Sequence, residues 1–306
     1  MRRLKSRFWL ILLAAFTLRL LPLRWHSFHP DEALYSWWAV QIARGEDPLL
    51  LSAWVDKPPL YLYILAASFR LFGTSEFSAR FTGVFAGTIS VALTWAWLKS
   101  LYGERVAAIG SILMAFLPFP VLFSPTALTD PWLSMLSTGS MWMACSGRKP
   151  SLTAFLAGFF AGLAVGTKQQ GLLFIPLSLL LTYWRRREEK APILSWLLGF
   201  SIPFALVEWW DALRWATRPS FWERSLVTYG GLRPVPWSEL GLRFVKWLEL
   251  LSWTAGGPVP AAILTFSPFL NRSLKVNRFD LALAGFAGGL FLLHWLLSFQ
   301  TWDRYI

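Results

Sequence analysis

The segment Leu152–Gly166 reads LTAFLAGFFAGLAVG, a run without a single charged side chain. A helix that crosses a bilayer needs about 20 mostly apolar residues, with a range of roughly 17–25. Eight further segments have the same apolar character: Phe8–Leu23, Phe81–Leu98, Val106–Phe123, Pro131–Cys145, Gly171–Trp184, Ile193–Trp210, Leu250–Leu270 and Leu281–Ser298. The pattern predicts an all-α polytopic membrane protein, with about nine spans in a single transmembrane domain, 1–306.

Composition supports this class. The chain is 55% hydrophobic and only 15% charged, whereas soluble domains carry about 25% charged residues. The net charge of +12 is spread between apolar runs, so we expect contact with membrane lipids and not with nucleic acid. The single cysteine, Cys145, rules out a disulfide within the chain and a cysteine metal site, and we interpret it as a core residue. The basic segment Met1–Arg7 precedes an uncleaved first span.

The distribution of charge predicts the orientation, because cytoplasmic loops carry the basic excess. With the N-terminus in the cytoplasm, two long segments, Arg24–Arg80 and Asp211–Glu249, are external. Only four of the 17 acidic residues fall on the inner side, namely Glu104, Glu188, Glu189 and Asp280. The carboxylates therefore gather on the external face, where we expect the chemistry.

The first external segment contains Phe28-His29-Pro30-Asp31-Glu32-Ala33-Leu34-Tyr35. Pro30 suits the first turn of a helix, apolar residues then recur at helical spacing, and Gly45 ends the run. We predict an interfacial helix in which Asp31 and Tyr35 share one face. Two interpretations of the acids have about even odds: favourable placement at the positive end of a helix dipole, or a general base at a membrane boundary.

A second cluster reads Val55-Asp56-Lys57-Pro58-Pro59-Leu60-Tyr61. The prolines permit a helix after them, over Leu60–Phe72, and place Lys57 just ahead of its N-terminus. An ammonium beside free backbone N–H groups attracts anions. The alternative is a lysine that snorkels to the interface, which we consider the weaker interpretation.

These motifs, followed by Phe72-Gly73-x-Ser75-Glu76-x-Ser78-Ala79-Arg80, resemble the protein mannosyltransferase and lipid A aminoarabinose transferase families, which are membrane glycosyltransferases with the GT-C fold. The resemblance continues with Thr129-Asp130-Pro131-Trp132, Gly162-Leu163-Ala164-x-x-Thr167-Lys168 and Trp302-Asp303-Arg304-Tyr305, and so covers essentially the whole chain. It implies a GT-C bundle with interfacial helices in the first external loop.

The resemblance also implies roles. Asp31, with Glu32 beside it, would be the base that deprotonates an acceptor hydroxyl, which displaces the lipid phosphate from the sugar with inversion. Lys57 would hold the donor phosphate, with Tyr35, Tyr61 and Lys168 in the same group. Asp56 matches a metal-binding position of some relatives, so a divalent ion (Mg²⁺, Mn²⁺ or Zn²⁺) is possible, with His29 as a weaker candidate ligand.

Some of these positions have equally ordinary explanations. Asp130 matches a second acid of the family, but an Asp before a Pro is also a common helix cap, and we divide the two evenly. Lys168 lies at a membrane boundary and could simply snorkel. His294 is isolated and is interpreted as a satisfied core or pore-facing histidine.

Two departures from the family are visible. Leu34 stands where aminoarabinose transferases carry an arginine, and the chain stops at Ile306 although relatives run on, so we expect a truncated C-terminus. The expected function is transfer of sugar from a polyprenyl-phosphate donor to a protein, lipid or glycan acceptor. We expect this transfer on the external face of the plasma (inner) membrane. The alternative is a transporter or flippase for a lipid-linked or anionic solute, which is disfavoured because transporters place charges at the bilayer midplane.

Overall fold

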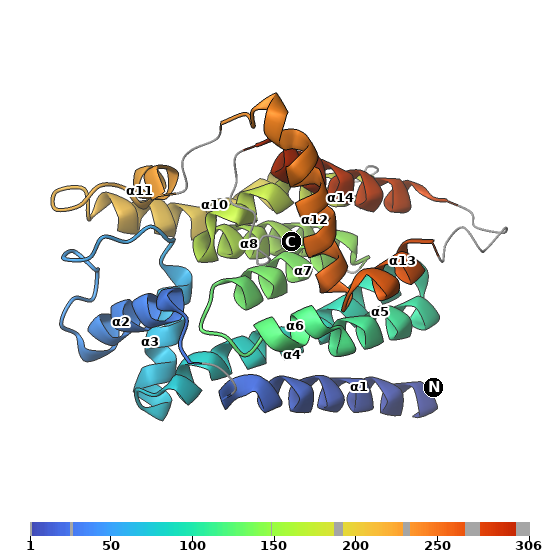
Figure 1. The fold of residues 1–306 in the computed structure, drawn as a ribbon, viewed down its shortest axis with the longest axis horizontal. Helices are drawn as coiled ribbons and strands as arrows, with labels where there is room; N and C mark the ends of the chain where they lie inside the picture. Colours follow the sequence, from blue (N-terminus) through green and yellow to red (C-terminus); the bar gives the residue numbers. More distant parts are fainter. Residues whose placement is uncertain are drawn as a thin grey trace. The chain divides into compact units, whose positions relative to one another are not determined.

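The computed structural model describes residues 2–24, 27–147, 149–186, 192–228, 233–266 and 276–297. These residues form helices, and the one β-bridge among them joins Pro234 to Leu297 (Figure 1). The α-helices are α1 (Arg2–Leu20), α2 (Pro30–Arg44), α3 (Leu60–Phe72), α4 (Glu76–Tyr102), α5 (Glu104–Phe116), α6 (Pro118–Phe123), α7 (Asp130–Cys145), α8 (Pro150–Thr167), α9 (Ile175–Arg186), α10 (Pro192–Ala212), α11 (Phe221–Thr228), α12 (Leu240–Thr254), α13 (Pro258–Phe266) and α14 (Arg278–Leu296).

Four of the described helices, α4, α8, α10 and α14, are long and apolar enough to cross a membrane by length and composition. The chain is therefore an all-α integral membrane protein, as the sequence predicts. It divides into two compact units. The first comprises Met1–Phe116 and Val121–Arg224, and the second comprises Leu117–Pro120 and Ser225–Ile306. All the candidate site residues named above lie in the first unit.

Within the first unit, α8 and α10 pack backbone against backbone. A Cβ atom added at Gly158 would overlap the carbonyl oxygen of Trp196, and one added at Gly199 would overlap that of Phe155. Small residues let membrane helices approach this closely. The glycines of the predicted span Leu152–Gly166 thus serve helix packing, and this contact fixes the end of α8, where the chain continues to Lys168.

The buried Arg19 near the end of α1 fastens that helix to its neighbours. Its guanidinium donates hydrogen bonds to the hydroxyl oxygen of Ser124 at 3.1 Å and to the carbonyl oxygens of Met114 and Ala115 at 2.8 and 3.3 Å. Carbonyls at the end of α5 lack partners within their own helix. A charge that would be costly in the bilayer therefore satisfies them and holds α1 in place.

The two helices predicted within Arg24–Arg80 are confirmed. Helix α2 begins at Pro30 behind His29, whose imidazole caps it, and it ends at Gly45 in the left-handed conformation, with φ 72°. Helix α3 runs over Leu60–Phe72, as its prolines predict. Local signals suffice here because a proline start and a glycine stop each act within one turn.

The second unit departs from the expectation of one continuous span over Leu250–Leu270. The chain forms α12 and α13 instead, with a break at Gly256 and Gly257, whose φ values are 94° and 127°. Side chains rarely adopt such backbone angles, so the glycines allow the turn. In α14, His294 lies against the Trp247 ring and its Nδ1 is 2.8 Å from the carbonyl oxygen of Leu290, in agreement with a satisfied core histidine.

Candidate active site

Glu32 is the centre of a buried network. Its carboxylate receives two hydrogen bonds of 3.0 Å from Arg80, one through Nε and one through Nη2. It also accepts the backbone N–H of His29 at 2.9 Å and that of Ala127 at 2.8 Å. Both charged side chains are at most 4% exposed. The two carboxylate oxygens therefore have four donors, which is the satisfied geometry that a buried ion pair requires.

Arg80 extends this network to the end of the first span. It donates to the carbonyl oxygens of Leu23 and Ser27, each at 3.0 Å, and its guanidinium lies 4.9 Å from the centre of the Phe28 ring. One ion pair thus joins three segments: the chain before α2, the start of α4 and the loop before α7. We call Glu32 and Arg80 the buried hub. Arg80 closes the third family motif, yet its partnership with Glu32 was not predicted from the sequence.

Asp31 differs from its neighbour. Its backbone N–H donates to His29 Nδ1 at 3.2 Å, and its carboxylate lies 3.9 Å from the same nitrogen. The Asp31 side chain remains 29% exposed. His29 therefore has a local capping task, and the hub fixes the turn on which Asp31 stands while its carboxylate stays accessible.

The Asp56–Lys57 motif forms an ion pair at the start of α3. Lys57 Nζ lies 2.7 Å from Asp56 Oδ2, with the lysine side chain 3% exposed and the aspartate 15%. A lysine that snorkels would carry its ammonium into water. That alternative is wrong for Lys57, because the whole side chain is buried.

Asp130 and Lys168 form a second pair, from α7 and the end of α8. Lys168 Nζ lies 2.7 Å from Asp130 Oδ1, and the side chains are 6% and 22% exposed. Asp130 is the first residue of α7, and the cap position is taken by Thr129, which makes no side-chain capping bond. Neither the capping of α7 by Asp130 nor snorkelling by Lys168 describes what these side chains do.

The two ion pairs lie on adjoining segments. Gln169, directly after Lys168, donates through Nε2 to the backbone carbonyl of Asp56 at 2.7 Å. A Cβ placed on Gly166 would lie 3.7 Å from Leu60 Cβ. The loop that carries Asp130 is tied in turn to the buried hub through Ala127. The structure therefore brings together four of the predicted residues, Asp56, Lys57, Asp130 and Lys168, and links their neighbourhood to Glu32.

The two predicted tyrosines are buried beside this group. The Tyr35 and Tyr61 rings meet edge to face with centroids 6.4 Å apart, and Tyr35 also stacks on Trp38. The hydroxyl of Tyr61 is buried and has no hydrogen-bond partner of standard geometry within the described residues. Both tyrosines pack in the core that supports α2 and α3, and direct contact of either with a phosphate stays a prediction.

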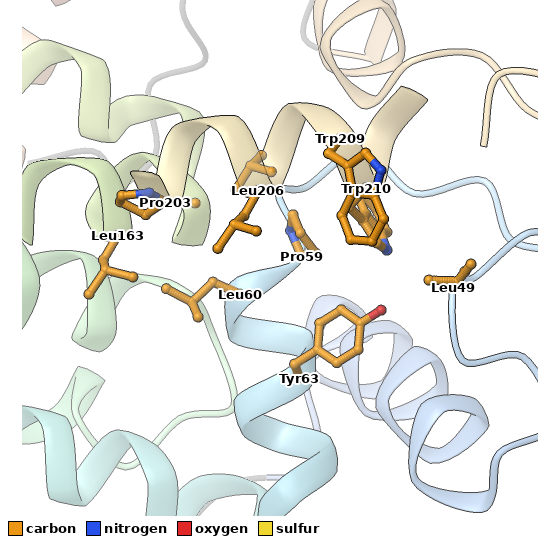
Figure 2. A pocket seen from close by; sticks show the side chains of 11 residues that line it. Leu49, Pro59, Leu60, Tyr63, Leu163, Pro203, Leu206, Trp209 and Trp210 are labelled. Carbon is orange, nitrogen blue, oxygen red and sulfur yellow. The ribbon is translucent and has the colours of Figure 1, made fainter. Parts of the chain in front are cut away.

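An apolar pocket of about 320 Å³ adjoins the ion pairs. Figure 2 shows side chains from α3, α8, α10 and the loop before α3 around it. The lining residues are Leu49, Pro59, Leu60, Tyr63, Leu163, Gly166, Pro203, Leu206, Val207, Trp209 and Trp210. Pro59 follows Lys57 by two residues, and Gly166 precedes Lys168 by two. The wall of this pocket thus continues directly into the two lysine-bearing segments.

Arg214, which was not predicted from the sequence, fixes the loop at the edge of the pocket. It is fully buried and donates to the carbonyl oxygens of Leu50 and Ala53 at 3.2 and 2.9 Å. In the same loop, Asp47 accepts three hydrogen bonds, two from Ser52 and one from the Leu51 N–H. Partial burial alone would raise the pKa of Asp47, but these bonds and the charge of Arg214 outweigh it and lower that pKa.

The tentative metal ligands of the sequence analysis, Asp56 and His29, have other partners in the structure. Among the described residues, no three His, Cys, Asp or Glu side chains lie together as a metal site. Asp56 faces an ammonium at 2.7 Å, and His29 caps α2. A divalent ion at Asp56 therefore stays a prediction. The motif Trp302-Asp303-Arg304-Tyr305 lies outside the described residues.

Comparison with known proteins agrees with this geometry. Residues 56–210 match the family described as dolichyl-phosphate-mannose-protein mannosyltransferase. The chain belongs to this family. The match begins at Asp56 and includes both ion pairs, the Arg80 side of the buried hub and most of the pocket.

Individual relatives are similar to the chain over about two thirds of its length. It is 28% identical over 241 residues to the undecaprenyl phosphate-alpha-4-amino-4-deoxy-L-arabinose arabinosyl transferase of Enterobacter sp., covering 71% of this chain and 42% of that protein. The protein of that name from Pseudomonas aeruginosa is 29% identical over 224 residues, covering 68% of this chain and 40% of that protein. The chain thus spans less than half the length of these relatives.

A solved structure confirms the fold. The crystal structure of ArnT from Cupriavidus metallidurans bound to undecaprenyl phosphate superposes with a TM-score of 0.66 at 18% identity, covering 97% of this chain and 56% of that one. At this identity the likeness establishes the fold alone. The expected GT-C bundle is therefore the architecture of this family member.

Proposed function

We propose that this protein is a glycosyltransferase that takes sugar from a polyprenyl-phosphate donor. The observation that carries the proposal is the position of two buried lysines, Lys57 and Lys168, at the edge of an apolar pocket. Ammonium groups recognise a phosphate, and an apolar pocket accommodates a hydrocarbon chain. Family membership, and relatives whose names contain undecaprenyl phosphate, support the same donor class.

The donor has two parts, and the protein offers one region for each. The phosphate would contact Lys57 and Lys168, and the first isoprene units would enter the pocket between Leu60, Leu163 and Leu206 (Figure 2). The sugar would then lie on the exposed side of the phosphate, toward Asp31. In this arrangement the lipid anchors the donor while its reactive carbon stays near water.

The proposed reaction is one displacement. The acceptor hydroxyl loses its proton to the Asp31 carboxylate as its oxygen forms a bond to C1 of the sugar. The bond between C1 and the phosphate oxygen breaks, and its electron pair leaves with the polyprenyl phosphate. Attack from the side opposite the leaving group inverts C1. Asp31 suits this role because its carboxylate is partly exposed on a rigid turn.

Glu32 has a different task in this proposal. Its carboxylate is occupied by Arg80 and two backbone N–H groups, so we assign it to positioning and not to proton transfer. It would hold the turn that carries Asp31 against the loop that leads to Asp130. A protein, lipid or glycan acceptor would approach from the external face of the inner membrane, the side on which the charge asymmetry predicts both long loops.

The test is donor turnover by the purified protein in liposomes. Polyprenyl-phosphate sugars that differ in the sugar are supplied together with a heat-treated membrane extract as the source of acceptor hydroxyls, and released polyprenyl phosphate is measured by mass spectrometry. We expect release above empty liposomes that receive the same extract, and slower release from Lys57→Met at limiting donor. Donor that crosses the bilayer with its sugar intact would instead establish a flippase, and the absence of both events would reject the donor class.

A further inference from the structure

Each lysine of the proposed phosphate site already holds a carboxylate. Lys57 Nζ lies 2.7 Å from Asp56 and Lys168 Nζ lies 2.7 Å from Asp130. These distances are those of charge-assisted hydrogen bonds. The lysines are almost fully buried, whereas the aspartates keep 15% and 22% exposure. The anion is therefore the more accessible partner in both pairs.

A phosphate that binds these lysines must compete with the carboxylates. A negative group close to a carboxylate raises the energy of both, so phosphate and carboxylate are not both stabilised at full contact with one ammonium. The exposed edges of Asp56 and Asp130 give each carboxylate a route toward water. The lysine side chains lack such a route, because they are only 3% and 6% exposed.

We propose that Asp56 and Asp130 are displaceable counter-ions of the phosphate site: they hold Lys57 and Lys168 while the site is empty, and they compete with the phosphate of the polyprenyl carrier when it binds. This inference rests on the proposed function. It gives the two acids a task that needs neither a metal ion nor proton transfer.

The competition serves product release. The donor is a phosphodiester with one negative charge. Once its sugar has left, the carrier is a phosphate monoester, which carries about 1.5–2 negative charges near neutral pH. Two lysines alone would therefore bind the product more tightly than the substrate. Carboxylates that return to the lysines oppose this, so that turnover does not stall on bound carrier.

The counter-ion role predicts that the aspartate variants bind the phosphate monoester more tightly than the parent protein does. If the acids were ordinary ligands of the donor, Asp56→Asn or Asp130→Asn would weaken binding. If they are counter-ions, removing the negative charge should tighten binding of the phosphate monoester. The expected change is about tenfold or more, the scale on which one nearby charge alters the charging of another. The empty variants should also unfold at lower temperature, because a buried lysine has lost its charged partner.

The experiment measures the affinity of undecaprenyl phosphate for the purified protein in detergent, together with thermal unfolding with and without this probe. The variants are Asp56→Asn and Asp130→Asn. The matched control is Glu104→Gln, which removes the acid of an exposed pair with Lys99, 2.6 Å apart on another part of the unit. Lys57→Met and Lys168→Met test the phosphate site itself.

Tighter binding in either aspartate variant, with the control unchanged, supports the counter-ion role. Equal or weaker binding in every aspartate variant that folds overturns it. In that case the lysine variants still decide the proposed function: their loss of binding would retain the phosphate site, and normal binding would reject both. If Asp130→Asn does not fold, the affinity of Asp56→Asn alone decides between these outcomes.

Discussion

Asp31 and Glu32 are adjacent in sequence and share one helical turn, yet they occupy opposite environments. Glu32 is buried, with four donors to its two oxygens. Asp31 keeps 29% of its side chain exposed beside an imidazole. A saturated carboxylate cannot take up a proton without losing its partners, whereas an accessible one can. The comparison shows how one acidic dipeptide can supply both a rigid frame and a reactive group.

The basic side chains of the site also differ in how completely their partners are enclosed. Arg80 binds its carboxylate through two nitrogens and donates to two carbonyls as well, which is a use of the planar guanidinium that a lysine cannot reproduce. Lys57 and Lys168 each face an aspartate that retains contact with water. We therefore expect the Glu32–Arg80 ion pair of the buried hub to stay intact, and the two lysines to exchange their aspartate partners for phosphate.

Arg80→Met should produce the largest loss of stability. It leaves Glu32 buried without its charged partner, a change that typically costs about 3–5 kcal/mol. Thermal unfolding in detergent measures the effect. The control is Lys99→Met, which removes an exposed ion pair and should leave unfolding unchanged. Equal unfolding temperatures for the two variants would contradict the expectation that the buried hub contributes more to stability than an exposed ion pair does.

Lys57→Met should act on the donor more than on the fold. Loss of one charge-assisted hydrogen bond to phosphate corresponds to about 1.5–3 kcal/mol, or roughly tenfold to hundredfold in KM for the lipid donor. Steady-state kinetics with varied donor gives this value. An unchanged KM would remove Lys57 from the phosphate site.

Gly45→Ala tests the backbone of α2, the helix that carries Asp31 and Glu32, without changing any charge. Gly45 has a φ of 72° at the end of α2, with open space where a Cβ would stand, so the cost is backbone strain of about 1–2 kcal/mol. The matched control is Gly241→Ala in α12, which also has open space but should be neutral or slightly stabilising. We expect lower stability and normal turnover for the first variant, and a large loss of turnover would mean that the end of α2 takes part in chemistry.

The smallest effect concerns pH. The lowered pKa of Asp47 means that its contribution to stability is present above the pKa of the unfolded chain, about 3.9, and is lost as pH falls through the lower folded value. Asp47→Asn should therefore lower stability modestly at neutral pH, and its difference from the parent should shrink as pH falls through the folded pKa of Asp47. Unfolding curves of variant and parent between about pH 2 and 5 that stay parallel would contradict the role of this loop aspartate.

Local structure could be predicted from the sequence because its signals act over one turn. Pro30 and Gly45 mark α2, and the Pro58–Pro59 pair marks the start of α3, so both helices were predicted correctly. The break between α12 and α13 was missed, although Gly256 and Gly257 stand in the chain, because glycines are also common inside membrane helices.

Partnerships across the fold could not be predicted in this way. Glu32 meets Arg80 from 48 positions away, and Asp130 meets Lys168 from 38. No periodicity connects such positions, so the sequence placed Glu32 beside Asp31 in the catalytic group and left Arg80 without a role. Arg214 was missed for the same reason, since its acceptors are backbone carbonyls more than 160 positions away, which leave no trace in side-chain patterns.

The division of labour between the two adjacent acids is tested most directly by turnover and thermal unfolding of Asp31→Asn and Glu32→Gln, measured on the same preparations with a polyprenyl-phosphate sugar. Asparagine retains the shape of Asp31 but cannot accept the proton, so turnover should fall by about 10²–10⁴-fold with the unfolding temperature unchanged. Glu32→Gln should instead lower the unfolding temperature, because Arg80 loses its counter-charge. Near-normal turnover in Asp31→Asn, or a fall in its stability as large as that of Glu32→Gln, would contradict this division.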